Sequence, residues 1–306
     1  MKKYLINSLL FGFLLILIVE LGLRFYGLHT PILYVHSDSY EYVFAPNQNL
    51  KRFRNSIITN EFSMRSKSVS KNKKIILGFG DSVLNGGALT HHDSLATTKL
   101  NNRLNKERRI DSIQILNISA GSWGPDNAYS FLEEKGSFGA KVFFLVVSSH
   151  DLKDNKIDNR KGNQIIPGNC RSFPKKNPNS AIEGLIRRYI IPDKRKGRNK
   201  KVNEFLIHLA KKENSGFMNF INYSKKNKIK LLFYLHPTLL ELKNKEFNDF
   251  GKRIIEIAKE NNIELISGLE FEQESGYRDA IHFNDKGQEV FAKTLEPYLV
   301  KAINNL

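Results

Sequence analysis

The chain has 306 residues, and its composition of 41% hydrophobic and 26% charged residues is that of an ordinary globular protein. A single cysteine, Cys170, excludes an intramolecular disulfide framework. The formal net charge of +17 has three competing explanations: attraction to an anionic lipid or glycan surface, nucleic-acid binding, and a compositional bias towards Lys and Asn.

The amino terminus is typical of a membrane anchor. Residues 4–23 are nearly all apolar, about the length that crosses a bilayer, and Lys2 and Lys3 before them favour a cytoplasmic amino terminus. A cleaved signal peptide is the alternative, but its apolar core is normally shorter, and Arg24-Phe-Tyr-Gly-Leu28 contains no small-x-small cleavage site. We therefore predict a single-pass signal anchor over residues 1–26 in the cytoplasmic (inner) membrane, with the remaining chain on its outer, periplasmic side.

A domain outside the cytoplasmic membrane is separated from DNA and RNA, and the sequence contains no nucleic-acid-binding motif. We therefore expect the membrane as a partner and no nucleic acid. Compositional bias, together with some attraction to an anionic envelope surface, is the favoured explanation of the charge.

Residues 27–72 form a juxtamembrane segment with many polar residues. Within it, the short runs 32–35 and 40–44 predict strands. The polar stretches 47–49 and 65–72 predict loops.

From residue 73 onward, short apolar runs alternate with helix-like stretches. The predicted strands are residues 75–79, 113–118, 142–147, 230–235 and 263–266. The predicted helices are residues 94–106, 126–136, 202–226, 247–261 and 286–303. Continuous apolar runs are typical of strands covered on both faces, so residues 73–306 predict an α/β domain with a parallel sheet of about five strands between helices. We expect Asp285 to cap the last helix and Gln288 to reach back to its start.

One connection interrupts this alternation. Residues 153–201 are rich in Lys, Asn and Pro. This segment is unusually long for a connection between two strands. A solvated basic loop and a substrate lid are both compatible with this composition.

The first strand of the domain ends in Gly80-Asp81-Ser82. Ligands of open α/β sheets bind outside the carboxyl ends of the strands, so a serine there is a candidate nucleophile. The alternative is a turn in which Asp and Ser have only local roles. We expect the next helix to begin after Gly86-Gly87, which leaves the Ser82 amide free. Leu84 replaces the second glycine of a Gly-x-Ser-x-Gly elbow, and Val83 replaces the third glycine of a dinucleotide fingerprint.

Polar residues also follow the other predicted strands. Gly121 follows the second, Ser148-Ser-His150-Asp151 the third, and His236 the fourth, while Asp279 and His282 follow the fifth. Because these strands are predicted to be parallel, we expect all of these residues to cluster at one edge of the sheet.

Gly80-Asp81-Ser82, Gly121 and Asp279-Ala-Ile-His282 together resemble the SGNH (GDSL-type) hydrolase family, over roughly residues 73–304. The resemblance implies a three-layer, flavodoxin-like α/β/α sandwich, with Ser82 as nucleophile, His282 as general base and Asp279 orienting the histidine. The anchor is similar to that of membrane-tethered members linked to bacterial envelope glycans.

The family's oxyanion hole uses the backbone amide of the serine, that of a glycine and an Asn side chain. Ser82 and Gly121 match the first two, but His150 stands at the Asn position. An imidazole N–H also donates hydrogen bonds, so the role is compatible with His150. Altered substrate geometry, a weaker or inactive enzyme, and a purely structural histidine are the alternatives. We further expect Asp81, Asp151 and His236 to contact substrate.

The sequence therefore predicts a serine esterase that forms an acyl-enzyme on Ser82 and acts on ester groups, above all O-acetyl groups, of an envelope glycan. An O-acetyltransferase with the same triad, a lipid esterase and a catalytically silent polysaccharide-binding or assembly protein are the alternatives. This chemistry requires no cofactor. We expect no metal site at His91-His92-Asp93 or His150-Asp151, because the chain has no helical His-x-x-x-His pair and adjacent histidines rarely bind one ion together.

Overall fold

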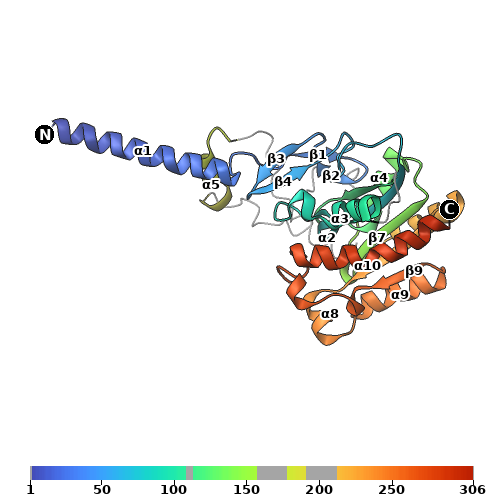
Figure 1. Ribbon diagram of the computed structural model, residues 1–306. Helices are drawn as coiled ribbons and strands as arrows, with labels where there is room; N and C mark the ends of the chain where they lie inside the picture. The colour runs from blue at the N-terminus through green and yellow to red at the C-terminus, as the bar shows by residue number, and fades with distance from the viewer. Residues whose placement is uncertain (1, 108–112, 157–177, 191–211, 306) are drawn as a thin grey trace.

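The computed structural model describes residues 2–107, 113–156, 178–190 and 212–305 (Figure 1). Helix α1 (Lys2–Tyr26) projects away from the body of the molecule, and none of its residues is buried. Its apolar stretch is long enough to span a membrane. An exposed apolar helix of this length is what the predicted anchor requires.

Two antiparallel hairpins connect α1 to the main domain. They consist of β1 (Tyr34–Ser37), β2 (Glu41–Phe44), β3 (Asn49–Arg52) and β4 (Asn55–Ile58). The first hairpin confirms the two strands predicted near residues 32–35 and 40–44. The second was not predicted, because its turn residues Phe53 and Arg54 both have positive φ, at 49° and 66°. Asn and Gly are the usual residues of such a turn, so the sequence carries no turn signal there.

A five-stranded parallel sheet forms the centre of the main domain and confirms the predicted fold class. Its strands are β5 (Lys74–Gly80), β6 (Ile113–Ser119), β7 (Val142–Ser148), β8 (Lys230–His236) and β9 (Glu264–Ser267). They pair in the order β6-β5-β7-β8-β9. The chain passes from β5 to one side of the sheet and then to the other, so the end of β5 lies at the topological switch point where such folds bind ligands.

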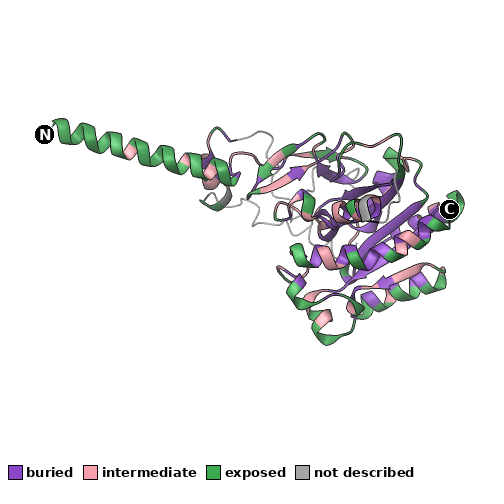
Figure 2. Cartoon of the chain, viewed as in Figure 1, coloured by how far each residue is buried: buried purple, intermediate pink, exposed green. Residues whose placement is uncertain are grey.

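Helices cover both faces of this sheet, which makes a three-layer sandwich. One face carries α4 (Pro125–Lys135), α7 (Gly216–Asn227) and α9 (Asp249–Glu260), and the other carries α3 (Ala96–Asn102) and α10 (Asp285–Asn304). Successive residues of β5 point into opposite layers: Leu77 and Phe79 join one apolar cluster and Ile76 joins the other. Figure 2 shows these strands buried between the helices.

Two predicted helix boundaries were wrong. Helix α2 (Ser82–Asn85) begins at the serine itself, whereas the next helix was expected only after Gly86-Gly87. Asn284, instead of Asp285, caps α10, and its side chain accepts hydrogen bonds from the amides of Lys286 and Gly287. Gln288 does not reach back to the helix start, because its Oε1 accepts from Ala96 N at 2.8 Å.

The long excursion is described only in part. Residues 178–190 contain α5 (Ala181–Leu185) and one further helical turn, Ile186–Ile190. Residues 157–177 and 191–211 lie outside the described residues, as does much of the helix predicted over 202–226. The choice between a basic loop and a lid stays a prediction.

Candidate active site

The turn after β5 holds Ser82 at the carboxyl edge of the sheet. Asp81 is buried and caps α2, and its Oδ1 accepts a hydrogen bond from Val83 N at 2.8 Å. Ser82 is the first residue of α2, so its backbone N–H has no partner within that helix. The turn thus leaves both a hydroxyl and an amide available to a substrate at the same residue.

His282 joins Ser82 to Asp279. Its Nε2 lies 2.9 Å from Ser82 Oγ, and its Nδ1 lies 3.0 and 2.9 Å from the two carboxylate oxygens of Asp279. Asp279 Oδ1 also accepts from the amides of Ile281 and His282, at 3.0 and 2.8 Å. Partial burial would raise the pKa of Asp279, but these hydrogen bonds hold it below its ordinary value. An ionised Asp279 accepts the Nδ1 proton, which leaves the Nε2 lone pair facing the serine.

Two arginines fix the loop that follows α2. Arg65 is fully buried, and its guanidinium donates to the carbonyls of Asn85, Gly87 and Thr90 at 2.6–2.8 Å. Arg278, next to Asp279 in sequence, donates to Thr90 Oγ1 at 3.1 Å. Burial, with a smaller contribution from Arg278, lowers the pKa of Arg65 to about 9. This pair ties the Ser82 loop to the Asp279 loop.

Sequence reasoning missed Arg65, because residues 65–72 were predicted to be an ordinary polar loop. A buried arginine hydrogen-bonded to backbone carbonyls has no local sequence signal. Its role depends on contacts with residues about twenty positions away.

Gly121 lies beyond β6, where the second oxyanion donor was predicted. The Tyr42 hydroxyl donates to its carbonyl oxygen, so the first hairpin supports this loop. A Cβ added at Gly121 would meet no atom within 4 Å, so the backbone there is open to an approaching group. The predicted role in an oxyanion hole fits this open position.

His150 is the second residue of the helical turn Ser149–Leu152 after β7 and lies beside Asp81. Its Nε2 is 4.0 Å from Asp81 Oδ2 and 3.6 Å from Asp151 Oδ1, and 46% of its side chain is exposed. The Asp151 carboxyl raises the pKa of His150, although desolvation opposes the rise and Asp81 adds to it. The structure therefore places a half-exposed imidazole near the Ser82 turn, and its role as an oxyanion donor stays a prediction.

Asp81 and Asp151 were predicted to contact substrate, but both carboxyl groups are buried. Asp151 Oδ2 accepts from Ser148 N at 2.7 Å, and burial raises the pKa of Asp151 to about 8. Asp81 serves as the helix cap. These two residues support Ser82 and His150 from below, which corrects the prediction.

His236 was also predicted to contact substrate, and this too is corrected. Its side chain is fully buried, with Nδ1 3.0 Å from Glu272 Oε1 and Nε2 2.6 Å from the Ile281 carbonyl oxygen. Burial would lower the pKa of His236, but the Glu272 carboxylate and the carbonyl raise it above its ordinary value. A protonated ring donates from both nitrogens and so holds the loop that carries His282. The contact of Glu272 with His236 was not predicted, since the two residues lie 36 positions apart in the sequence.

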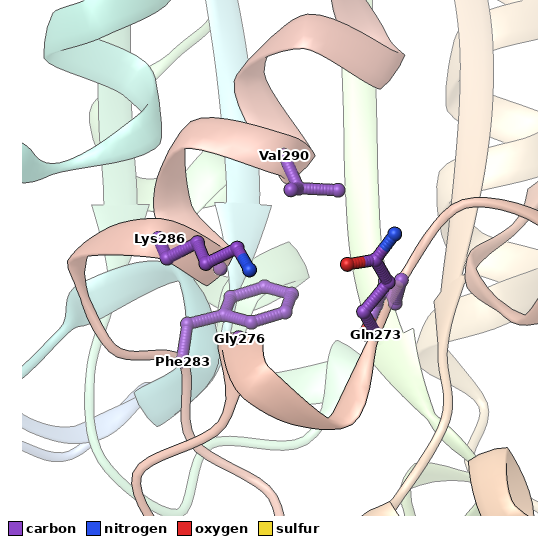
Figure 3. Close-up of a pocket in the computed structure, with 7 residues that line it drawn as sticks. Gln273, Gly276, Phe283, Lys286 and Val290 are labelled. Carbon is purple, nitrogen blue, oxygen red and sulfur yellow. The ribbon is translucent and has the colours of Figure 1, made fainter.

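Two further features lie near the site. Among the described residues, Asp81, His150 and Asp151 bring ligand-type atoms within 4.8 Å of one another. Asp81 Oδ1 and Asp151 Oδ2 accept backbone N–H groups, whereas Asp151 Oδ1, 3.6 Å from His150 Nε2, is buried without a hydrogen-bond partner among the described residues. A small hollow between the start of α10 and the preceding loop is lined by Gln273, Phe283, Lys286 and Val290, among others (Figure 3). None of Ser82, Asp279 and His282 lines this hollow.

No protein-family model matches the chain, and no characterised protein matches its sequence. Several solved structures are similar. An acetyl xylan esterase has a TM-score of 0.45 and 16% identity, over 73% of this chain and 98% of its own. A two-domain esterase active on acetylated mannans has a TM-score of 0.44 and 12% identity, over 75% and 50% of the two chains. The esterase EstA from Pseudoalteromonas sp. has a TM-score of 0.43 and 13% identity, over 76% and 100%.

Proposed function

We propose that the chain is a serine esterase that removes short acyl groups, above all acetyl, from a glycan of the cell envelope. The observation that carries this proposal is the continuous set of hydrogen bonds from Asp279 through His282 to Ser82 Oγ, all between 2.9 and 3.0 Å. Nucleophile, base and orienting acid are thus in contact before substrate binds.

In the first half of the reaction, Ser82 Oγ attacks the ester carbonyl carbon while His282 Nε2 takes the hydroxyl proton. Asp279 stabilises the imidazolium that forms. The tetrahedral intermediate then collapses, the C–O bond to the alcohol breaks, and His282 returns the proton to the leaving sugar oxygen. An acyl group remains on Ser82.

In the second half, a water molecule takes the place of the alcohol. His282 removes one water proton as the oxygen attacks the acyl carbon, and the carboxylic acid leaves as the proton returns to Ser82. A sugar hydroxyl acting in place of water would make the protein an acyltransferase, since the triad serves both nucleophiles.

The negative oxygen of the tetrahedral intermediate requires hydrogen-bond donors. We assign this role to the backbone N–H groups of Ser82 and Gly121 and to the His150 side chain. A protonated His150 adds positive charge to the donor, which suits a developing oxyanion.

Replacing His150 by alanine is expected to lower kcat by about 10²-fold, since one oxyanion donor is lost. His150→Asn retains an N–H donor and should keep most of the activity. Because the pKa of His150 is raised, the imidazolium persists above its ordinary range, and the wild-type rate should fall as pH rises through that value. The Asn variant should lack this decline. Identical pH–rate profiles for all three proteins would remove His150 from the mechanism.

The preference for a small acyl group on a sugar rests on polarity. Ser82 Oγ lies within hydrogen-bond distance of His282 Nε2, at 2.9 Å, and of Asp81 Oδ2, at 3.4 Å, and His150 Nε2 lies 4.0 Å from the same carboxylate oxygen. Such surroundings favour a polar acylated sugar over a long acyl chain, which requires an apolar channel.

Hydrolysis of an acetylated oligosaccharide, of 4-nitrophenyl acetate and of 4-nitrophenyl palmitate tests this function. Acetate release from the first two and slower cleavage of the palmitate are expected. Faster cleavage of the palmitate would favour a lipid esterase, and no turnover of any ester by folded protein would favour a silent binding protein. Chromatography of the sugar products identifies acetyl transfer if it occurs.

A further inference from the structure

The end of α1 is joined to the helical segment Ala181–Ile190. Glu20, in the last two turns of α1, accepts hydrogen bonds from the amides of Ala181 and Ile182 at 2.8 and 3.0 Å. These are donors that a helix start leaves without intrahelical partners. Gly184 packs against the chain after α1, where a Cβ would lie 2.3 Å from the Leu28 carbonyl oxygen. The segment is therefore attached where the apolar stretch of α1 ends.

The same segment turns large apolar side chains outward. The exposed fractions are 37% for Ile186, 64% for Tyr189 and 66% for Ile190. Together with Ile182, these residues follow the i, i+4, i+7, i+8 spacing of one apolar helix face, whereas Leu185 is half-buried against the cluster that contains Leu28 and Ala181. The small residues Ala181 and Gly184 are buried on the side of α1.

The loop that follows Ser82 and α2 lies next to this junction. Ala88 packs against the apolar cluster that contains Leu28 and Ala181, and its carbonyl accepts from Asn55 Nδ2 at 3.1 Å. The next residue, Leu89, is 58% exposed. The His282 loop leads into the amino-terminal end of α10. In Figure 1, this end of α10 is the one nearer to α1, and its carboxyl end lies on the opposite side of the domain.

We infer that the segment Ala181–Ile190 lies on the surface of the bilayer that α1 crosses, with Ile186 and Ile190 at the acyl boundary. The occupant of this face is lipid, because the face continues directly from a helix long enough to span a membrane. The net charge of +17 suits an anionic lipid surface.

This placement brings the Ser82 loop to the membrane surface. The substrate is then an ester on the polar head of a molecule held in the membrane, such as an acylated sugar on a lipid anchor. This second step rests on the proposed esterase function, whereas the docking of Ala181–Ile190 does not.

Nitroxide labels in the full chain test the docking. In a Cys170→Ser background, single cysteines replace Ile186, Ile190, Leu14 and Leu240, and each labelled protein is placed in phosphatidylcholine–phosphatidylglycerol vesicles. Leu240 is the matched control, since it is an apolar residue of α8 (Leu239–Asn244) that is 68% exposed. Labels at Ile186 and Ile190 should collide more with oxygen than with a water-soluble nickel complex, and the label at Leu14 in α1 should do the same. Collision rates equal to those at Leu240 would overturn the docking.

Kinetics test the substrate class. The Ile186→Glu/Ile190→Glu variant should cleave an acetylated sugar on a vesicle-held lipid anchor about tenfold more slowly, with unchanged cleavage of soluble 4-nitrophenyl acetate. Leu240→Glu should leave both rates unchanged. Equal rates for the double variant and wild type on the anchored ester would overturn the membrane-held substrate. Failure of the proposed esterase function can be distinguished from failure of the membrane inference. If the chain is no esterase, wild type cleaves neither ester, and the label measurements still decide the docking.

Discussion

Replacing Ser82 by alanine is expected to lower the turnover of an acetyl ester by at least about 10⁴-fold, because no other group replaces the lost Oγ in the acyl-enzyme. Ser82 Oγ is the atom that His282 Nε2 contacts at 2.9 Å. The serine contributes little to the fold, since Asp81 and Val83 provide the helix cap. Initial rates with 4-nitrophenyl acetate, compared with the thermal unfolding midpoint, separate catalysis from stability.

Ser275→Ala is the control for this experiment. Ser275 is exposed, and its Oγ accepts a hydrogen bond from Lys286 Nζ at 2.7 Å, without contact to the triad. Its removal should leave the rate unchanged. Undiminished turnover by pure Ser82→Ala protein would end the proposed mechanism.

The Asp279→Asn substitution should lower kcat by about 10³ to 10⁴-fold with little change in stability. An Asn Oδ1 still accepts the amides of Ile281 and His282, so the loop geometry survives. Its NH₂ group, however, donates to His282 Nδ1 and places the imidazole proton on Nε2. The ring then faces Ser82 with a proton instead of a lone pair, and general-base catalysis is lost.

Asp249→Asn provides the matched control, because Asp249 is an exposed residue at the start of α9. Its kcat should equal that of wild type. Wild-type kcat in Asp279→Asn would show that Asp279 does not set the tautomer of His282.

The sheet was predictable because most of its strands are short, largely apolar runs without polar alternation. Burial on both faces requires such a pattern, and β7, with all seven residues buried, shows it most clearly. Strand alternation with helices then fixed the parallel arrangement. The β3–β4 hairpin was not predictable, since Phe53 and Arg54 occupy a turn that normally takes Asn or Gly.

The chemistry at the site was predictable to the extent that it follows strand ends. The positions of Ser82, Asp279 and His282 on one edge follow from parallel strands and a shared topology. The roles of Asp81, Asp151 and His236 did not follow, because residue type alone does not reveal burial. His236 is hydrogen-bonded to Glu272 and to the Ile281 carbonyl, both distant in sequence. Because both ring nitrogens have partners within the protein, this histidine positions the neighbouring loop instead of binding a ligand.

The proposed membrane-facing arrangement depends on contacts that the sequence does not show. Glu20 accepts hydrogen bonds from the amides of Ala181 and Ile182, about 160 residues further along the chain, and such contacts arise only in the folded protein. The long excursion was predicted as a loop or a lid. Its described part is hydrogen-bonded to Glu20 of α1 and exposes Ile186 and Ile190, while the choice between a loop and a lid stays a prediction.

The central claim is that Ser82 is a nucleophile activated by His282. A fluorophosphonate probe reacts covalently with such a serine, and peptide mass spectrometry identifies the residue that carries the adduct. The predicted result is one phosphonyl group on Ser82 in wild-type protein and none in Ser82→Ala or His282→Gln. Folded wild-type protein that stays unlabelled at Ser82, or that is labelled equally without His282, would contradict the claim.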